Sequence, residues 1–483
     1  MKIVSSIIKG EPVIHDEKYK IYNPADTREI VSEYSPATLD DVKYAFEVAS
    51  ETFSLWSSKT PHERAKILYR AANIVEDGSE DLARLLTREM GKTINESRAE
   101  VERVPWILRF YASLIVRING YTIPSQLREG LILTVREPLG VVSVITPWNF
   151  PISIPAWKIV PAIATGNTVV FKPASITPTI AYRFVEILHR AGLPPGVVNL
   201  IIGSGGKIGR EMVTNKHVEA ISFTGSTDTG TEISRIVGDL DRHVRLQLEL
   251  GGKNATIVTD DAPLNEAVEI IVRGAFAVAG QVCAATSRVI VHRDLYDKLV
   301  EALKVRIDRM KVGNGLDPST DMGPLASMDQ KKKVLSYIEI GKNEGAKLVY
   351  GGYALESGDY AYGYYVKPTL FTDCEPKHRI FQEEIFGPVL CVTPYSSIDE
   401  AIELANSVKY GLVLGIVSRD PRKFMKIARE AKVGVVRINR QTTGMEFQAP
   451  FGGVKASGND LYKEQGIEAL DFYTRIKTIY MHW

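Results

Sequence analysis

A carboxylate and a thiol, each beside glycines, are the side chains of this sequence best suited to covalent chemistry. Glu249 opens the run Glu-Leu-Gly-Gly-Lys, and Cys283 closes the run Gly-Gln-Val-Cys. A thiolate is a strong nucleophile, whereas a free thiol with a pKa of about 8.5 is only a few per cent ionised at neutral pH. A carboxylate raises the pKa of a nearby thiol, so Glu249 is expected to act as a general base on the thiol or on a later water. The pair suggests covalent catalysis followed by hydrolysis.

Neither residue is diagnostic alone. A single Cys commonly serves as a small buried apolar side chain, and a Glu before two glycines commonly ends a strand. The interpretation therefore depends on the sequence around Glu249 and Cys283, and on the elements that hold them.

Length and composition bound the function classes. The 483 residues exceed what one core holds, so two or three domains are expected. Hydrophobic residues make up 45% and charged residues 24%, and the net charge of +1 provides no general attraction for nucleic acid or anionic membrane. We recognise no signal peptide and no apolar run of the roughly 20 residues that a membrane span needs. Three widely spaced cysteines favour a reducing compartment, the cytoplasm, and no ligand spacing predicts a metal.

From Gly140 onward, apolar runs alternate with helical patterns. Expected strands 141–145, 168–171, 197–201 and 220–223 each precede a helix, and strand 244–248 leads directly into Glu249. Such alternation predicts a doubly wound parallel sheet, and a second alternation from 255 to about 438 predicts another α/β unit. Before Gly140 the sequence predicts two strands around Asn23-Pro24 and several helices, one starting at the capping box Thr60–Glu63. The last of them, about 93–118, is expected to be interrupted at Pro105.

Two distant segments alternate apolar and polar residues like exposed strands. They are residues 121–136 and 473–483, and we expect them to pair as a protruding arm. An exposed strand edge invites association unless something covers it. A partner subunit is the expected cover.

Three motifs follow the expected strands at the edge where doubly wound sheets bind ligands. They are Thr146-Pro-Trp-Asn-Phe-Pro151, Phe171-Lys-Pro-Ala-Ser175 and Phe223-Thr-Gly-Ser-Thr-Asp-Thr-Gly230. The glycines of the third would let backbone N–H groups approach a pyrophosphate at a helix N-terminus. It is not the GxGxxG pattern, so by itself it indicates dinucleotide binding only weakly.

Six motifs together resemble, in chain order, the signatures of the aldehyde dehydrogenase superfamily. They are Pro147–Pro151, Phe223–Ser226, Glu249–Lys253, Gly280–Cys283, Glu384–Pro388 and Pro450–Gly453. The resemblance implies an α/β fold with a Rossmann-like cofactor domain (1–120 and 139–249), an α/β catalytic domain (250–450) and a β-arm for oligomerisation (121–138 and 464–483). It also implies a homo-oligomer, either a dimer or a tetramer.

Catalytic roles follow from the same resemblance. It implies that the Cys283 thiolate attacks the aldehyde carbon, and that the Asn149 amide and the backbone N–H of Cys283 stabilise the oxyanion. Hydride leaves to the nicotinamide, and Glu249 activates the water that hydrolyses the thioester.

For the cofactor, the resemblance implies that Lys172 contacts the adenosine ribose and Glu384 the nicotinamide ribose. Many members that prefer NAD carry Glu where this chain has Ser175, which neither repels nor excludes a 2′-phosphate. NADP is therefore expected, with NAD possible. The residues expected to bind the dinucleotide are Thr146, Pro147, Trp148, Lys172, Ser175, Gly206, Gly225, Ser226, Gly230, Leu250, Glu384 and Phe386.

The aldehyde pocket is less well specified. Its expected residues are Phe150, Trp157, Val282, Arg440 and Phe447, with Arg440 a candidate clamp for a carboxylate or phosphate. The run 441–447 resembles 2-oxoglutarate semialdehyde dehydrogenases, although Trp157 stands where enzymes specific for succinic semialdehyde can carry Arg.

Several other functions stay open at this point. A non-phosphorylating glyceraldehyde-3-phosphate dehydrogenase and a broad aliphatic aldehyde dehydrogenase would share the catalytic motifs. The presence of Glu249 counts against a CoA-acylating enzyme. The intact set of Cys283, Glu249 and Asn149 counts against a catalytically silent structural protein.

Overall fold

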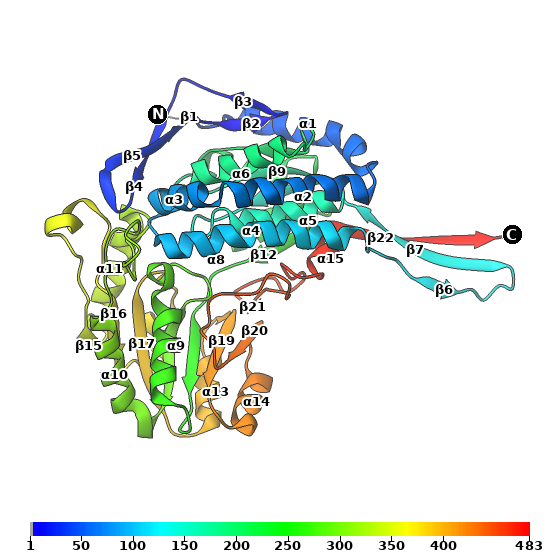
Figure 1. The fold of residues 1–483 in the computed structure, drawn as a ribbon. Coiled ribbons are helices and arrows are strands. Elements are labelled where there is room, and N and C mark those ends of the chain that lie inside the picture. Colours follow the sequence, from blue (N-terminus) through cyan, green and yellow to red (C-terminus); the bar gives the residue numbers. More distant parts are fainter. Residues whose placement is uncertain (1–2) are drawn as a thin grey trace.

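Two seven-stranded sheets occupy the body of the chain, as seen in the computed structural model, which describes residues 3–483 (Figure 1). The first has the order β12-β11-β8-β9-β10-β2-β3, with β8 to β12 parallel and β2 and β3 antiparallel at one edge. Its strands are β2 Ser6–Ile8, β3 Glu11–Val13, β8 Val141–Ile145, β9 Thr168–Lys172, β10 Val198–Leu200, β11 Val218–Thr224 and β12 Arg245–Glu249. The central strands are buried on both faces, as continuous apolar runs require.

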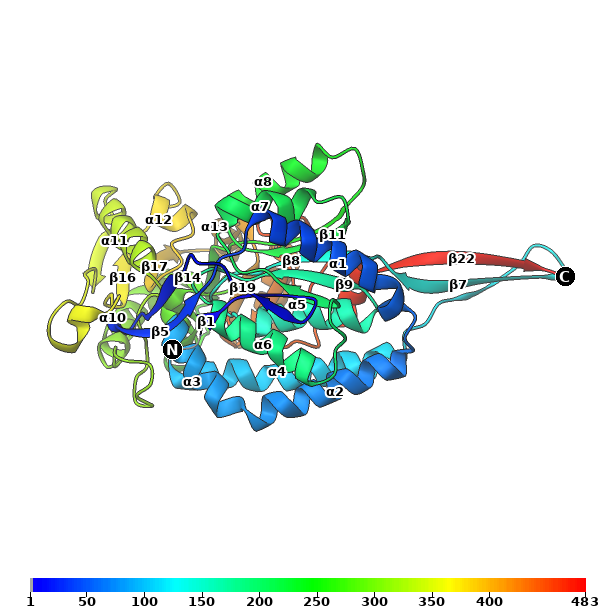
Figure 2. The ribbon, with the colours of Figure 1, turned by 90° about the horizontal axis from the view of Figure 1, so that it is seen from above.

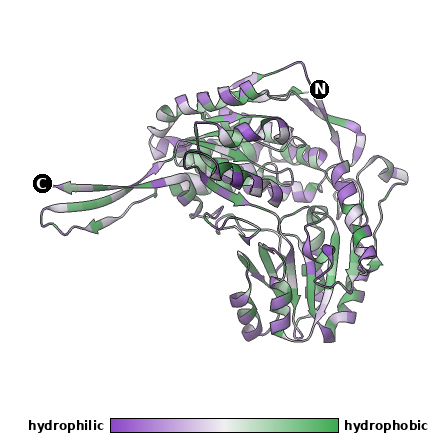
Figure 3. Cartoon of the chain, turned by 180° about the vertical axis from the view of Figure 1, so that it is seen from behind, coloured by the Kyte–Doolittle hydropathy of each residue, from purple (hydrophilic) through white to green (hydrophobic). Residues whose placement is uncertain are grey.

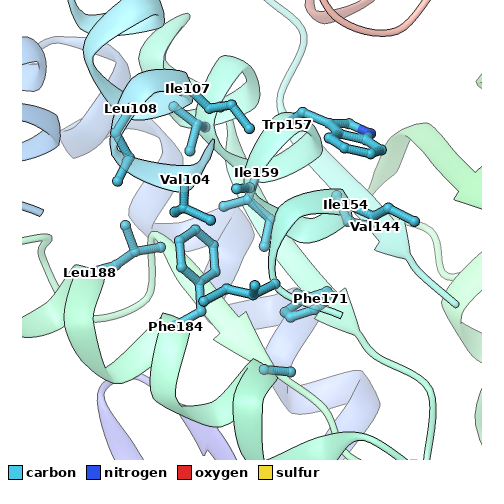
Figure 4. Close-up of a cluster of buried hydrophobic side chains, with 14 of the residues drawn as sticks. Val104, Ile107, Leu108, Val144, Ile154, Trp157, Ile159, Phe171, Phe184 and Leu188 are labelled. Carbon is cyan, nitrogen blue, oxygen red and sulfur yellow. The ribbon is translucent and has the colours of Figure 1, made fainter. Parts of the chain in front are cut away.

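Helices cover both faces of this sheet (Figure 2). One face carries α1 (Leu39–Ser57), α7 (Gly205–Thr214) and α8 (Thr227–Gly238), which share one apolar cluster. The other carries α5 (Ser153–Ala164) and α6 (Pro178–Arg190), with α2 (Pro61–Asp77), α3 (Ser79–Met90) and α4 (Ile94–Ile115) packed outside them. Figure 4 shows the centre of this second layer, where Phe184 and Leu188 of α6 lie near Val104 and Leu108 of α4.

Local sequence signals fix the ends of the N-terminal helices. Thr38, Thr60 and Thr93 each form a capping box with the acidic residue three positions on, and α3 ends at Gly91 with a left-handed φ of 95°. The expected interruption at Pro105 is wrong, because α4 continues through it with Pro105 buried. Packing of α4 against α2 and α5 offsets the roughly 3 kcal/mol that an interior proline costs.

The second sheet has the order β15-β16-β17-β14-β13-β19-β20 and is parallel except for β15. Its strands are β13 Asn254–Val258, β14 Thr286–His292, β15 Lys347–Tyr350, β16 Thr369–Thr372, β17 Val389–Tyr395, β19 Val413–Val417 and β20 Val435–Ile438. Its helices are α9 Leu264–Phe276, α10 Tyr296–Asp308, α11 Met328–Asn343, α12 Arg379–Gln382, α13 Ile398–Asn406 and α14 Pro421–Glu430. Separate apolar clusters fill its two faces. The α/β class with two largely parallel sheets is thus confirmed.

An arm projects from the body (Figure 1). It consists of β6 (Thr122–Pro124), β7 (Gly130–Pro138) and β22 (Thr474–His482), and β22 pairs antiparallel with the whole of β7. The two distant segments therefore pair as expected. Hydrophobic residues occur along the arm (Figure 3), and Tyr480 and Trp483 are 76% and 70% exposed.

The expected arm boundary at 464 needs correction. Residues 464–473, including α15 (Ala469–Tyr473), pack into the body, because Glu464 is buried in an ion pair with Lys158. Short elements complete the chain: β1 Ile3–Val4, β4 Tyr19–Asn23, β5 Asp26–Tyr34, β18 Tyr410–Gly411, β21 Val454–Lys455 and the 3-10 helices η1 Ala277–Gly280, η2 Arg293–Leu295 and η3 Gly358–Tyr362. Within residues 3–483, no helix combines the length and apolarity that crossing a bilayer requires.

Candidate active site

A cleft of about 800 Å³ lies at the carboxyl ends of β8, β9 and β11. It collects most of the residues that the sequence predicts to bind a dinucleotide. These are Thr146, Pro147, Trp148, Lys172, Ser175, Gly206, Gly225 and Ser226. Parallel strands end at one edge of the sheet, so motifs separated along the chain converge here.

Close contacts explain why glycine occurs at some positions in and near this cleft. A Cβ on Gly225 would lie 2.5 Å from the Phe223 ring. Gly230 and Leu250 do not line the cleft, and a Cβ on Gly230 would lie 2.4 Å from Leu250. Gly205 and Gly209 of α7 face open space in the cleft, which side chains would fill. Ser226 caps α8 by accepting a hydrogen bond from the N–H of Thr229 at 3.3 Å. A dinucleotide fits this site, because its pyrophosphate can approach backbone N–H groups at a helix N-terminus.

Polar side chains also face the cleft. The ammonium group of Lys172 donates to the carbonyl oxygen of Pro173 at 3.1 Å, and burial lowers its pKa to about 8. The hydroxyl of Thr146 is buried and has no hydrogen-bond partner among the described residues. Arg210 of α7 lines the same cleft as Ser175. Sequence analysis missed Arg210, although its position one turn into the helix after the glycines was a usable signal.

A second, narrow pocket of about 60 Å³ contains the predicted thiol and carboxylate together. Among the residues expected to contact the aldehyde, Phe150, Trp157 and Val282 line it. The remaining lining residues are Arg103, Ile154, Thr224, Glu249, Leu250, Cys283, Ala284, Gly444, Met445, Phe451, Glu464 and Gln465. Strand ends of the first sheet and loops of the second α/β unit therefore build this pocket.

Cys283 is half-buried on the loop after η1. Val278 and Ala279 precede it in left-handed conformations, with φ of 52° and 54°. Gln281 anchors the loop by donating to the Val278 carbonyl at 3.0 Å and accepting from the Ala326 N–H at 2.9 Å. Burial raises the pKa of Cys283 to about 12, and the charges of Glu384 and Glu249 add to this effect. The resting site therefore holds a protonated thiol.

Asn149 lies beside the thiol loop. Its amide nitrogen donates to the carbonyl oxygen of Gln281 at 2.9 Å, while its amide oxygen accepts from the N–H of Phe150 at 3.1 Å. One amide hydrogen is left for another acceptor. The backbone around Asn149 is held by a buried ion pair that sequence analysis missed: Lys92 contacts both the Asn149 carbonyl and Glu100 at 2.6 Å. Glu100 also accepts from two N–H groups of the following turn.

Glu249 ends β12 and is 3% exposed. Its Oε2 atom is buried and has no hydrogen-bond partner among the described residues. Burial raises the pKa of Glu249 well above its usual range, the charge of Glu464 raises it further, and Lys158 opposes the rise. Glu464 is held by Lys158 and by the indole N–H of Trp157 at 2.9 Å. Glu249 is therefore a carboxyl group with raised proton affinity and a free oxygen beside the thiol pocket.

Glu384 and Phe386 lie apart from the cleft and line a small cavity beside Val282. Glu384 accepts a hydrogen bond from the N–H of Gly252 at 2.8 Å, and burial raises its pKa. The ring of Phe386 packs edge-on against Trp148 of the cleft, with ring centroids 5.4 Å apart. This contact places them next to the cleft without making them part of it.

Two expected pocket residues lie elsewhere. The chain turns after β20 at Asn439, whose φ is 53°, and Arg440 pairs with Glu446 at the exposed surface at 3.3 Å. Phe447 packs edge-on against Phe110. The expected clamp role of Arg440 is corrected accordingly, because Arg440 lines a different, open pocket.

Arg103 of α4 is the guanidinium that faces the thiol pocket, and sequence analysis missed it. It forms no hydrogen bond or ion pair within the described part of the chain, and burial lowers its pKa. Arg103 is hard to identify as a pocket residue from the sequence, because it is one of many charged residues on a long helix. Within residues 3–483, no cluster of His, Cys, Asp and Glu is arranged to hold a metal ion.

Comparison with known proteins identifies the class. Residues 13–479 match the aldehyde dehydrogenase family, and the chain belongs to it. The enzyme is an NAD(P)-dependent aldehyde oxidoreductase.

Three known proteins show how similar this chain is to other members of the family. The chain is 46% identical to 2,5-dioxopentanoate dehydrogenase of Saccharolobus solfataricus, over 97% of each chain. It is 44% identical to alpha-ketoglutaric semialdehyde dehydrogenase of Bacillus subtilis, over 96% of this chain and 94% of that one. Among solved structures, betaine aldehyde dehydrogenase of Staphylococcus aureus in complex with NAD+ matches with a TM-score of 0.96 and 37% identity, covering 99% of this chain and 95% of that one.

Proposed function

We propose that this enzyme oxidises 2-oxoglutarate semialdehyde, which is 2,5-dioxopentanoate, to the dicarboxylic acid. The observation that carries the proposal is Arg103, a guanidinium in the same pocket as Cys283 that forms no hydrogen bond or ion pair within the described residues, although the charge of Glu100 acts on it. A half-buried cation that no anion contacts directly is costly unless a ligand supplies the anion. The carboxylate at the far end of this substrate would do so through a charge-assisted, bidentate hydrogen bond.

The pocket also disfavours other classes of aldehyde. A substrate carrying a fixed positive charge, such as betaine aldehyde, would be repelled by Arg103. A simple aliphatic aldehyde would leave the guanidinium unpaired. The names of the two relatives above, which denote the same semialdehyde, support the proposal independently.

The chain's residues would act in sequence. Cys283 releases its thiol proton to water and forms a C–S bond to the aldehyde carbon, while Asn149 donates its remaining amide hydrogen to the developing oxyanion. The bound nicotinamide accepts a hydride from that carbon. Glu249 then takes a proton from water as the water attacks the thioester, and Cys283 leaves as the thiolate. The free Oε2 of Glu249 is suited to this step, since no protein donor occupies it.

For the cofactor we propose a preference for NADP. Ser175 stands where a carboxylate would repel a 2′-phosphate, and the same cleft is lined by two cations, Arg210 and Lys172, and by one carboxylate, Glu232. A phosphate dianion between cations is favoured over a neutral hydroxyl. Ser175 and the two cations together support the preference.

A matched pair of arginine variants tests the substrate. Arg103→Met should lower kcat/KM for 2-oxoglutarate semialdehyde by roughly 10- to 100-fold, the range expected when a hydrogen-bonded charge pair is lost. It should leave kcat/KM for pentanal unchanged or higher. Arg440→Met serves as the control and should leave both substrates unaffected, since Arg440 is outside the pocket. Equal losses for both substrates would contradict the proposal, and a wild type that prefers glyceraldehyde 3-phosphate would identify a phosphate as the anion.

We further propose that the enzyme is a cytoplasmic homo-oligomer with a cofactor domain built on the first sheet and a catalytic domain built on the second. The exposed aromatic residues of the arm would be covered by another copy of the chain. Truncation before Tyr473 should yield a smaller or aggregating species in size-exclusion chromatography with light scattering. A wild type eluting as a 53.5 kDa monomer would contradict this.

A further inference from the structure

A pair of buried cysteines lies in the second sheet, away from the thiol pocket. Cys391 is in the middle of β17, with Phe371 of β16 as its neighbour on one side and Arg288 of β14 on the other. Cys374 follows the end of β16 by two residues. Both are free thiols and are at most 1% exposed. The proposed reaction of the enzyme uses neither of them.

Local geometry brings the two sulfur atoms together. Asp373 has a left-handed φ of 54°, which turns the chain after β16 back toward β17. As a result, the N–H of Cys374 donates to the Val392 carbonyl at 3.5 Å, and the Thr393 hydroxyl donates to the Cys374 carbonyl at 2.7 Å. The two thiol side chains interact with each other, and each can also donate to a backbone carbonyl, Cys374 to Thr372 at 3.7 Å and Cys391 to Ile380 at 3.3 Å.

Two buried cations flank Cys391. The ammonium group of Lys253 is 1% exposed and has no hydrogen-bond partner among the described residues. Arg288 donates only to carbonyl oxygens, those of Lys253, Leu404 and Ala405. Neither cation forms a salt bridge with a carboxylate within residues 3–483, although the charge of the Glu384 carboxylate also acts on Lys253. A thiolate at Cys391 would add an anion beside both cations.

The ionisation behaviour agrees with this geometry. The hydrogen bond from Cys374 lowers the pKa of Cys391, and the charges of Lys253 and Arg288 lower it further. The pKa of Cys374 is raised, because its thiol is the donor in that hydrogen bond and is buried. As a thiol, Cys391 can instead donate to the Ile380 carbonyl at 3.3 Å. Because Arg288 is the cross-strand neighbour of Cys391, Cys391 is better placed than Cys374 to act as the nucleophile, and Cys374 would then be the resolving thiol.

We propose that Cys374 and Cys391 form a reversible disulfide when the enzyme meets a small hydroperoxide. The Cys391 thiolate attacks the peroxide, so an S–O bond forms, the O–O bond breaks and hydroxide leaves. The Cys374 sulfur then displaces the hydroxyl of the sulfenic acid, forming the S–S bond and breaking the S–O bond. The protons from the two thiols leave in water. Two thiols are oxidised by two electrons, and hydrogen peroxide is reduced to two water molecules.

Burial sets the selectivity of this reaction. Burial shields both sulfurs from a bulky aromatic disulfide reagent, so the proposed reaction requires an oxidant as small as hydrogen peroxide. In the folded enzyme the bulky reagent should modify Cys283 alone, which is half-buried in an accessible pocket. The same treatment after denaturation should modify all three cysteines.

The disulfide would also affect the catalytic groups. Lys253 lies between Gly252, whose N–H holds Glu384, and Asn254, whose amide donates to the Cys283 carbonyl at 2.7 Å. Oxidation removes the anion beside Lys253. Oxidation of the cysteine pair would therefore change the charge next to the backbone that supports the thiol pocket.

The test uses the Cys283→Ala variant of the full chain, in which Cys374 and Cys391 are the two cysteines left. After hydrogen peroxide, denaturation and alkylation, intact mass spectrometry should show the loss of two hydrogen atoms and no alkylation, both reversed by dithiothreitol. Retained nucleotide binding confirms the fold. Two alkylatable thiols after treatment, or a disulfide between chains on a non-reducing gel, would overturn the proposal.

Further variants separate the roles of the two sulfurs. With Cys374→Ser added, a sulfenic acid should persist on Cys391 and react with dimedone, whereas with Cys391→Ser added Cys374 should stay unmodified. Lys253→Met should slow the oxidation roughly ten-fold for each unit by which the pKa of the Cys391 thiol rises. Oxidation first at Cys374, or at an unchanged rate without Lys253, would refute the assignment of the nucleophile.

Discussion

The dinucleotide cleft and the thiol pocket adjoin each other but are built in different ways. The cleft is open, about 800 Å³, and is lined by glycines and short polar residues at strand ends together with apolar side chains such as Trp148 and Ile236. The pocket holds about 60 Å³ and collects ionisable side chains from distant segments, including Arg103, Glu249, Cys283 and Glu464. Binding of a large ligand thus depends on local backbone geometry, whereas the chemistry depends on how burial and neighbouring charges shift a few pKa values.

Removal of the Cys283 thiol should have the largest effect, and it should affect the thiol pocket without affecting the dinucleotide cleft. Cys283→Ala should lower aldehyde oxidation by roughly 10⁴-fold or more, as loss of an attacking nucleophile does. The dissociation constant for NADPH, measured by its fluorescence, should stay within about two-fold, because Cys283 does not line the cleft. Turnover near the wild-type rate would exclude the covalent mechanism.

The next largest effect is expected from Glu249→Gln. Steady-state turnover should fall by roughly 10²- to 10⁴-fold, the usual contribution of a general base. Rapid mixing should still show a burst of NADPH, followed by a stall, with acyl-enzyme detected by mass spectrometry. Loss of the burst together with turnover would place the action of Glu249 before acylation.

Ser175→Glu probes the cleft rather than the pocket. The new carboxylate should change the NADP-to-NAD ratio of kcat/KM by roughly 10- to 100-fold toward NAD, which corresponds to about 1.4–3 kcal/mol of repulsion. The kcat with saturating cofactor should change little. Arg210→Met is a companion variant that should weaken the binding of NADP and leave the binding of NAD unchanged. A wild type that already prefers NAD would contradict the NADP proposal itself.

The smallest effect concerns the charge next to the general base. Glu249 must be deprotonated to activate water, and the charge of Glu464 contributes to its raised pKa. Glu464→Gln removes that repulsion and leaves Lys158 uncompensated nearby, so both changes lower the pKa of Glu249. The acidic limb of the kcat–pH profile should therefore move to lower pH. An unchanged or upward-shifted limb would show that Glu464 does not act on Glu249 through its charge.

Local patterns in the sequence were sufficient for much of the fold. Capping boxes at Thr38, Thr60 and Thr93 mark helix starts through contacts only three residues apart. Apolar runs between turns located the parallel strands, and the rule that ligands bind at strand ends brought the cleft residues together before any coordinates. Pro105 is the exception, since its local signal is overridden by packing of α4 between its neighbours.

The thiol pocket shows what the sequence by itself determined and what only the tertiary structure decided. The sequence by itself identified Cys283 and Glu249 as candidates for the chemistry, because each stands in a short local motif. It did not determine that Arg103 faces the thiol while Arg440 faces solvent, nor that Glu464 and Lys158 form a buried pair beside Glu249. The physical reason is that burial and charge–charge interactions depend on distances in space, and residues hundreds of positions apart acquire those distances only when the two sheets pack together.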